Sequence, residues 1–153
     1  MTLKAGDKAP EFTLPDENGT PRTLSTLLAD GPVVLFFYPM AMTRGCTKES
    51  CHFRDLKAEF EAAGAQRVGI STDPVTKQKE FSTRNSFDYP LLSDEDGAVS
   101  SDFGVKRTGL LAKVGPVKRA TFVIGADGVI TDIISSEISF TQHADDALKA
   151  LAR

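Results

Sequence analysis

The sequence predicts an α/β fold in which helices flank a mixed β-sheet. Two apolar segments, residues 33–38 and 67–71, have the character of buried strands, and a helix-like segment follows each of them. Such alternation of strand and helix is typical of parallel strands joined by crossover helices. Later in the chain, two strand-like segments flank Asp127 and Gly128, a pair that favours a tight hairpin and therefore antiparallel strands.

The first third of the chain has β character. Residues 11–14 alternate in polarity, and the stretch 15–21 that follows is rich in turn residues, so we expect a short β region there. The run 33–38 is bounded by Pro32 and Pro39 and is rich in β-branched and aromatic residues. Because its apolar residues are continuous, this strand is expected to be buried on both faces.

A helix is expected next, with one apolar face. Phe53, Leu56, Phe60 and Ala63 recur at spacings of three and four residues, and Gly64 stands where the helix is expected to stop.

A second strand and helix follow directly. Residues 67–71 are again continuous in apolar character. Asp73 and Pro74 predict a cap and a first-turn proline for a helix that runs to about Arg84.

The last third of the chain predicts a hairpin and a closing helix. The hairpin strands are 120–124 and 129–134, and the helix fits 144–152, with acidic residues near its positive end. A parallel unit followed by a hairpin and a helix matches a thioredoxin-like sheet, here with an N-terminal β extension. At 153 residues, the chain is expected to form one domain over 1–153.

Composition excludes several classes of protein. Hydrophobic residues make up 41% and charged residues 25%, which is typical of a globular domain. Eighteen Lys and Arg stand against 21 Asp and Glu, for a net charge of −3, so a nucleic-acid partner is not expected. No apolar run reaches the length of a membrane span, and residues 1–8 lack a signal-peptide core. We therefore expect no membrane partner and a cytoplasmic location.

The two cysteines are too few for a disulfide scaffold. A zinc site would have to recruit Cys46, Cys51, His52 and the distant His143, and this spacing lacks a second ligand pair of the finger type. We expect no metal and no cofactor, and we interpret both histidines as ordinary surface residues.

The most informative segment, 38–51, joins the end of a buried strand to the start of a helix, where open α/β sheets place their ligands. If Thr43 caps that helix, Cys46 falls in its first turn. Unpaired backbone amides and the positive end of the helix dipole then favour a thiolate. The position suits a nucleophile.

Helix geometry separates the two cysteines. At 100° per residue, Cys46 lies close to the direction of the buried Phe53, whereas Cys51 lies roughly 140° away, toward solvent. Residues five apart in a helix have Cα atoms roughly 8–9 Å apart, and a disulfide needs less than about 7 Å. Either the two never bond, or the helix unwinds to let them.

The sequence resembles the peroxiredoxins, in particular the bacterioferritin-comigratory-protein (PrxQ) subfamily. The family's Pro-x-x-x-Thr-x-x-Cys motif is matched by Pro39, Thr43 and Cys46, and Cys51 matches the subfamily's second cysteine. The similarity extends over essentially the whole chain, including the opening residues 5–16 and the segments 69–73, 91–94 and 119–124.

The resemblance implies a peroxidase that reduces hydrogen peroxide and organic hydroperoxides. Cys46 would attack the peroxide, and Cys51 would resolve the product as an intramolecular disulfide, which thioredoxin or a similar dithiol would reduce. Thr43 would hydrogen-bond the peroxide, Pro39 would shield the pocket, and Arg119 would hold the thiolate. We expect a monomer or a weak homodimer.

Some features leave alternatives open. The residues between Pro39 and Thr43 are apolar, and no family pattern covers the loop 105–118, whose cations we interpret as a solvated face. Glu49 either stabilises the helix dipole or helps Arg119 to orient the site. A thiol-disulfide oxidoreductase and a peroxide-sensing redox switch remain alternative functions, although oxidoreductases of this kind use two intervening residues between their cysteines, not four.

Overall fold

The computed structural model describes residues 3–108 and 115–152. Its strands are β1 (Thr13–Pro15), β2 (Pro21–Thr23), β3 (Val33–Phe37), β4 (Gln66–Ser71), β5 (Leu91–Ser93), β6 (Ala120–Ile124) and β7 (Ile130–Ser135). Its helices are α1 (Leu24–Leu28), α2 (Arg44–Asp55), α3 (Lys57–Ala62), α4 (Val75–Asn85), α5 (Ala98–Asp102) and α6 (Gln142–Leu151). Within these described residues, every helix is too short or too polar to cross a lipid bilayer.

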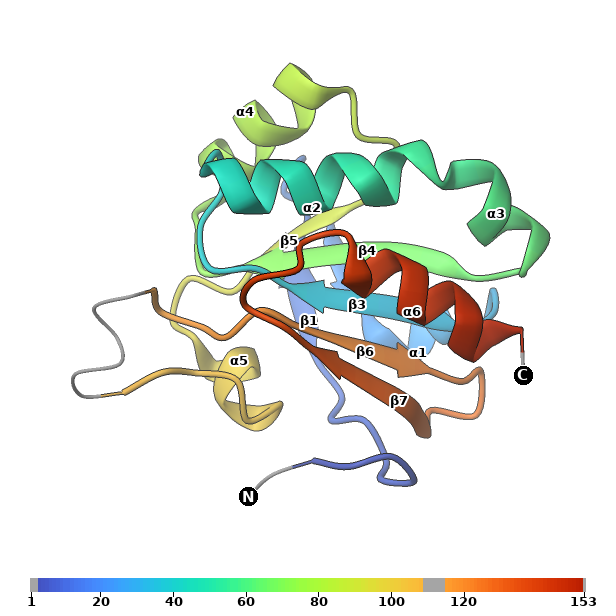
Figure 1. Cartoon of the computed structure of the whole chain (residues 1–153). Coiled ribbons are helices and arrows are strands. Elements are labelled where there is room, and N and C mark those ends of the chain that lie inside the picture. Colours follow the sequence, from blue (N-terminus) through green and yellow to red (C-terminus); the bar gives the residue numbers. More distant parts are fainter. Residues whose placement is uncertain (1–2, 109–114, 153) are drawn as a thin grey trace.

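A five-stranded mixed sheet forms the centre of the fold (Figure 1). Its strand order is β5-β4-β3-β6-β7, in which β3, β4 and β5 are parallel and β6 and β7 run antiparallel to their neighbours. Strands β1 and β2 form a separate antiparallel pair near the N-terminus. The predicted mixed sheet and N-terminal β extension are therefore confirmed.

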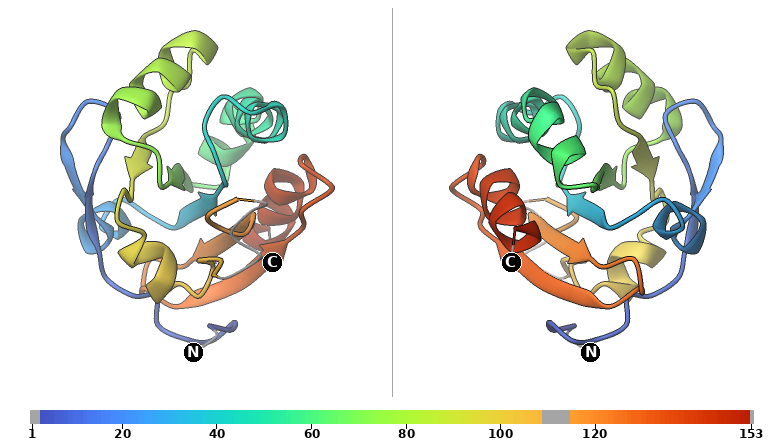
Figure 2. Two further views of the ribbon diagram at one scale, coloured as in Figure 1. Left: turned by 90° about the vertical axis from the view of Figure 1, so that its left-hand side faces the viewer. Right: turned by 90° about the vertical axis from the view of Figure 1, so that its right-hand side faces the viewer.

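Helices cover both faces of this sheet, and each face has its own hydrophobic core. Alternate residues of β3 enter the two cores, with Leu35 in one and Phe36 in the other, and every residue of the strand is buried. Helices α2, α3, α4 and α6 cover the face on which Phe36 lies, and α1 and α5 cover the opposite face (Figure 2). The expectation that this strand is buried on both faces is confirmed.

Two predicted boundaries in the middle of the chain need correction. The helix expected through Phe53 and Ala63 is two helices, because the backbone at Leu56 leaves helical geometry (φ −92°, ψ 22°) between α2 and α3. The predicted stop is present at Gly64, whose φ of +71° lies in the left-handed region that favours glycine. Pro74 is itself the cap residue of α4 rather than its first-turn residue.

The closing helix also begins earlier than expected. Helix α6 starts at residue 142 instead of 144 and packs on β6, β7 and α2. This packing places the start of α6 beside the first turns of α2, which contain the first cysteine.

Candidate active site

The loop between β3 and α2 is held in place by hydrogen bonds to its backbone. The backbone amide of Ala41 donates to Asp73 Oδ2 at 2.7 Å, and the Thr43 hydroxyl donates to the carbonyl of Met40 at 2.8 Å. Asp73, which the sequence suggested as a helix cap, therefore fixes this loop instead. The loop is preorganised before any substrate binds.

Thr43 is the N-cap residue of α2, as predicted, with extended backbone angles (φ −81°, ψ 157°). Its side chain does not bond to the first backbone amides of the helix. Because its proton is directed to the Met40 carbonyl, its oxygen retains lone pairs that can accept a hydrogen bond.

Cys46 lies in the first turn of α2, fully buried, as the sequence predicts. The guanidinium of Arg119, from the segment that leads into β6, donates from Nη2 to Cys46 Sγ at 3.3 Å. The fold thus brings together two residues that are 73 positions apart in the sequence. A cation and a helix N-terminus both favour the charged form of the thiol.

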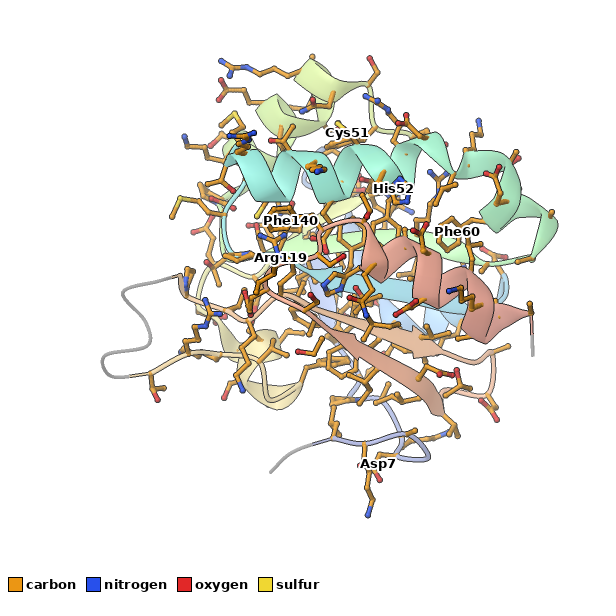
Figure 3. The ribbon with its side chains drawn as sticks, viewed as in Figure 1. Asp7, Cys51, His52, Phe60, Arg119 and Phe140 are labelled. Carbon is orange, nitrogen blue, oxygen red and sulfur yellow. The ribbon has the colours of Figure 1, made fainter. Side chains whose placement is uncertain are left out.

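Arg119 is buried, and three groups surround its guanidinium. Besides Cys46, the Glu49 carboxyl accepts from Nη1 at 2.9 Å, and the Phe140 ring lies 4.8 Å from the guanidinium carbon (Figure 3). Burial opposes the charge on Arg119, but Glu49 and Cys46 more than offset it and raise its pKa above the ordinary value. Arg119 is therefore a buried side chain of the site, and it remains charged.

Glu49 is the site residue that the sequence left undecided. It follows Cys46 by three positions on α2, so both side chains reach the same region, and it is fully buried. Burial raises the pKa of its carboxyl from 4.5 to about 8, although the charge of Arg119 acts in the opposite direction. Glu49 thus lies beside Arg119 in the site rather than on a solvated face of the helix.

The interpretation of His143 as a surface residue is wrong. Its side chain is fully buried at the start of α6, and its Nδ1 lies 2.7 Å from Thr121 Oγ1 and 3.6 Å from Glu49 Oε2. Burial lowers the pKa of this imidazole. By contrast, His52 is partly exposed and pairs with Asp145 at 2.8 Å.

Phe140 closes the site from the loop between β7 and α6. A Cβ atom placed on Gly45 would lie 2.8 Å from the Phe140 ring and 3.2 Å from Arg119 Nη2. Such a contact is closer than carbon atoms tolerate, so residue 45 has to be glycine for the ring to lie over the start of α2. No local pattern in the sequence indicates this contact.

Cys51 lies on the other side of α2, facing α4 (Figure 3). Its Sγ is 3.6 Å from Asn85 Oδ1, and burial raises the pKa of this thiol above its ordinary value. The predicted direction toward solvent is therefore corrected in part, since α4 half-buries the side chain. Both cysteines are free thiols on an intact helix.

Pro39 packs against the described end of the cationic segment 105–118. A Cβ on Gly115 would lie 3.0 Å from Pro39 Cβ, so the proline packs closely against that backbone. Arg107 is almost fully buried and pairs with Glu137 at 2.8 Å, which corrects the interpretation of this loop as wholly solvated. Lys113 lies outside the described residues.

Metal ligands do not gather in the described part of the chain. No group of three or more His, Cys, Asp or Glu side chains there is placed to hold a metal ion. The four residues considered for zinc are divided: Cys51 faces α4, while Cys46 lies beside Arg119.

The chain is similar to proteins of one known family. Residues 5–133 match the model of the AhpC/TSA family. Peroxiredoxin Bcp of Escherichia coli is 38% identical over 97% of this chain and 96% of its own length. The crystal structure of peroxidoxin BcpB from Mycobacterium tuberculosis has a TM-score of 0.92 at 63% identity and covers 98% of this chain and 97% of that one. The bacterioferritin comigratory protein of Xanthomonas campestris, studied for alkyl peroxide reduction, has a TM-score of 0.82 at 34% identity, covering 92% and 90%.

Proposed function

The chain belongs to the AhpC/TSA family and is a peroxiredoxin with a thioredoxin-like fold; from this premise we propose that Cys46 is the residue that attacks the hydroperoxide. The observation that carries the proposal is the 3.3 Å contact between Cys46 Sγ and Arg119 Nη2 at the N-terminus of α2. A buried cation at this distance stabilises a thiolate and offers donors to a nearby oxygen.

The first step oxidises the sulfur of Cys46. The thiolate forms a bond to the terminal peroxide oxygen while the O–O bond breaks, which gives a sulfenic acid and an alcohol or water once the leaving oxygen takes a proton. Arg119 stabilises the charge that develops on that oxygen, and the oxygen of Thr43 accepts a hydrogen bond from the peroxide. Pro39 restricts the access of water to the pocket around Cys46.

The second step joins Cys46 to Cys51 and releases water. In the intact helix the two Cα atoms are roughly 8–9 Å apart, beyond the span of a disulfide. We infer that the first turns of α2 unwind after oxidation. Hydrogen exchange should therefore lose protection over residues 44–51 in the oxidised protein but not in the reduced one, and full protection with the bond present would contradict this step.

Recycling requires a dithiol. We propose that thioredoxin or a similar dithiol reduces the Cys46–Cys51 bond by exchange, in a reducing compartment such as the cytoplasm. One copy of the chain carries both cysteines, so the cycle needs no second subunit, and a monomer or weak homodimer would suffice.

The test is steady-state consumption of hydrogen peroxide and of an organic hydroperoxide with thioredoxin, thioredoxin reductase and NADPH. The wild type should turn over many times, and Cys46→Ser should lose all activity while keeping its folded circular-dichroism spectrum. Turnover by Cys46→Ser within a few-fold of the wild type would exclude Cys46 as the nucleophile. Reduction of insulin disulfides without peroxide turnover would indicate a thiol-disulfide oxidoreductase, and a single oxidation without turnover would indicate a redox switch.

A further inference from the structure

The thiol of Cys51 donates a hydrogen bond to a side chain of α4. Its Sγ is 3.6 Å from Asn85 Oδ1, on the side of α2 that faces α4 (Figure 3). An amide oxygen can only accept a hydrogen bond, so this contact exists only while Cys51 keeps its hydrogen. A thiolate at the same place would face the lone pairs of that oxygen, which is unfavourable. The contact therefore selects the neutral thiol.

Two further hydrogen bonds fix the orientation of Asn85 at the end of α4. Its Nδ2 donates to the carbonyl of Phe81 at 3.0 Å, one helical turn earlier. Because that carbonyl can only accept, the amide nitrogen has to face it, and the amide oxygen is left to face Cys51. The backbone carbonyl of Asn85 accepts from Arg54 Nη1 at 2.8 Å, which ties the end of α4 to α2. The acceptor for the thiol is thus held in place from both helices.

The charges near Cys51 come from α2 and largely offset each other. Burial raises the pKa of the Cys51 thiol, while the charge of Arg54 lowers it and that of Asp55 raises it. Arg54 and Asp55 pair with each other at 2.9 Å. The Tyr89 phenol also faces Cys51, but burial raises its pKa far above the ordinary value, so it is neutral.

Helix α4 presents an uncharged group to the thiol. The charged side chains Glu80 and Arg84 of this helix pair with each other at 2.7 Å, and both are exposed. The amide of Asn85 is therefore the polar contact that α4 makes with Cys51.

The two cysteines of α2 lie in opposite environments. Cys46 faces a donor, Arg119 Nη2, whereas Cys51 faces an acceptor, Asn85 Oδ1. A donor stabilises a thiolate and an acceptor stabilises a thiol. Because peroxides react with thiolates, these two contacts direct oxidation to Cys46 and spare Cys51.

We propose that Asn85 is a positioning residue for the resolving step, which keeps Cys51 protonated and turned toward α4 until Cys46 is oxidised. Cys51 then leaves Asn85, loses its proton and forms a bond to Cys46 Sγ. The sulfur–oxygen bond of the sulfenic acid breaks, and its hydroxyl leaves as water with that proton, so one sulfur is oxidised and the other reduced to the disulfide. The proposal rests on the proposed role of Cys51 and adds the residue that controls it.

The first test is the S–H stretching band of Cys51, measured by Raman spectroscopy. The chain has two cysteines, so in Cys46→Ser this band belongs to Cys51 alone. A hydrogen bond weakens the donor S–H bond and lowers its stretching frequency. In the Cys46→Ser background, the band should move to higher frequency with Asn85→Leu, which removes the acceptor, and stay low with Asn85→Asp, which keeps one. Both substitutions lose the donor to Phe81, so a merely supporting Asn85 would give the same shift in both.

The second test is the rate at which the Cys46–Cys51 bond forms after one equivalent of hydrogen peroxide. Asn85→Leu should resolve about threefold faster than the wild type, the value of one hydrogen bond at the weak end of the usual range. Asn85→Asp should resolve at or below the wild-type rate, because a carboxylate is a stronger acceptor. The first oxidation of Cys46 should be unchanged in both. Arg84→Gln is the matched control at the same end of α4, and it should change neither the band nor the rate.

The inference and the proposed function fail separately. If the wild type forms no bond between Cys46 and Cys51, the role of Cys51 in the proposed function is refuted, and the S–H band alone decides whether Asn85 holds the thiol. If the bond forms, equal rates or equal band shifts in Asn85→Leu and Asn85→Asp would overturn the inference and leave Asn85 as a support of α4.

Discussion

Replacing Tyr89 by phenylalanine should speed the formation of the Cys46–Cys51 bond without changing the reaction of Cys46 with peroxide. The Tyr89 hydroxyl donates to the carbonyl of Ser50 at 2.7 Å, in the helical segment between the two cysteines. Both residues are buried. If this segment has to unwind before the disulfide can form, the hydrogen bond opposes the second step of the cycle.

The expected magnitude follows from the value of one hydrogen bond. A buried neutral hydrogen bond stabilises a folded structure by about 0.5–1.5 kcal/mol. If the variant loses about 1 kcal/mol of stabilisation of folded α2, the unwound population of α2 rises roughly fivefold, because RT is about 0.6 kcal/mol. The disulfide should then form about fivefold faster. The ring of Tyr89 keeps its contacts with Phe36, Phe87 and Arg67 in the variant, so the fold is preserved.

The assay is a single turnover with one equivalent of hydrogen peroxide, quenched with an alkylating reagent and resolved by mass spectrometry. Gln66→Met is the matched control, because Gln66 donates to the carbonyls of Leu27 and Gly31, away from α2. It should lower the free energy of unfolding without changing the disulfide rate. A wild-type disulfide rate in Tyr89→Phe, or an equal acceleration in Gln66→Met, would refute the idea that α2 unwinding limits this step.

Four further outcomes are expected. Cys51→Ser should consume its first peroxide equivalent at the wild-type rate, because the thiol on the far side of α2 takes no part in the attack. With excess peroxide, a second equivalent should then oxidise the sulfenic acid to sulfinic acid, as seen by mass spectrometry; a slowed first step would contradict this. Arg119→Met should slow the peroxide step about 100-fold or more, since it removes a hydrogen-bond donor from the site. It should also move the pH profile of Cys46 alkylation to higher pH, since it removes the neighbouring cation. An unchanged rate and an unchanged profile would count against the role of Arg119. Gly45→Ala should slow the same step by displacing the Phe140 ring, and adding Phe140→Ala should restore part of the rate; an unaffected single variant would show that the ring is not needed. The pKa of Glu49 in the folded protein, about 8, exceeds its unfolded value, so the folded state binds the proton more tightly. In urea titrations between pH 5 and 8, the free energy of unfolding of the wild type should therefore fall by up to about 1.4 kcal/mol per pH unit relative to that of Glu49→Gln. Parallel stability curves would mean that the carboxyl is ionised throughout.

Local patterns were sufficient for the long strands of this fold and insufficient for its short elements. Continuous apolar runs located β3 and β6 to within a residue, because strands buried on both faces tolerate few polar residues. Strand β5, with three residues, is too short to show a period. The break at Leu56 was missed because the apolar spacing continues through it, so the sequence pattern does not distinguish one helix from two.

For the candidate site, the sequence predicts the residues that lie within one continuous segment, but not those that tertiary packing brings to it from elsewhere in the chain. Thr43 and Cys46 followed from the strand-to-helix junction, and Arg119 followed only from the family resemblance. His143 could not be found in this way, because a histidine near a helix start has no periodic signal of burial. Its position depends on how α6 packs against α2 and β6, which no local spacing encodes.

The most direct measurement of the proposed cycle is a peptide map of the protein after one equivalent of hydrogen peroxide. The wild type should consume one peroxide per chain and yield a single intramolecular link between Cys46 and Cys51, and Cys46→Ser should yield neither. Peroxide consumption by the wild type with Cys46 unmodified, or with Cys46 oxidised and Cys51 still a free thiol, would contradict the assignment of these two residues.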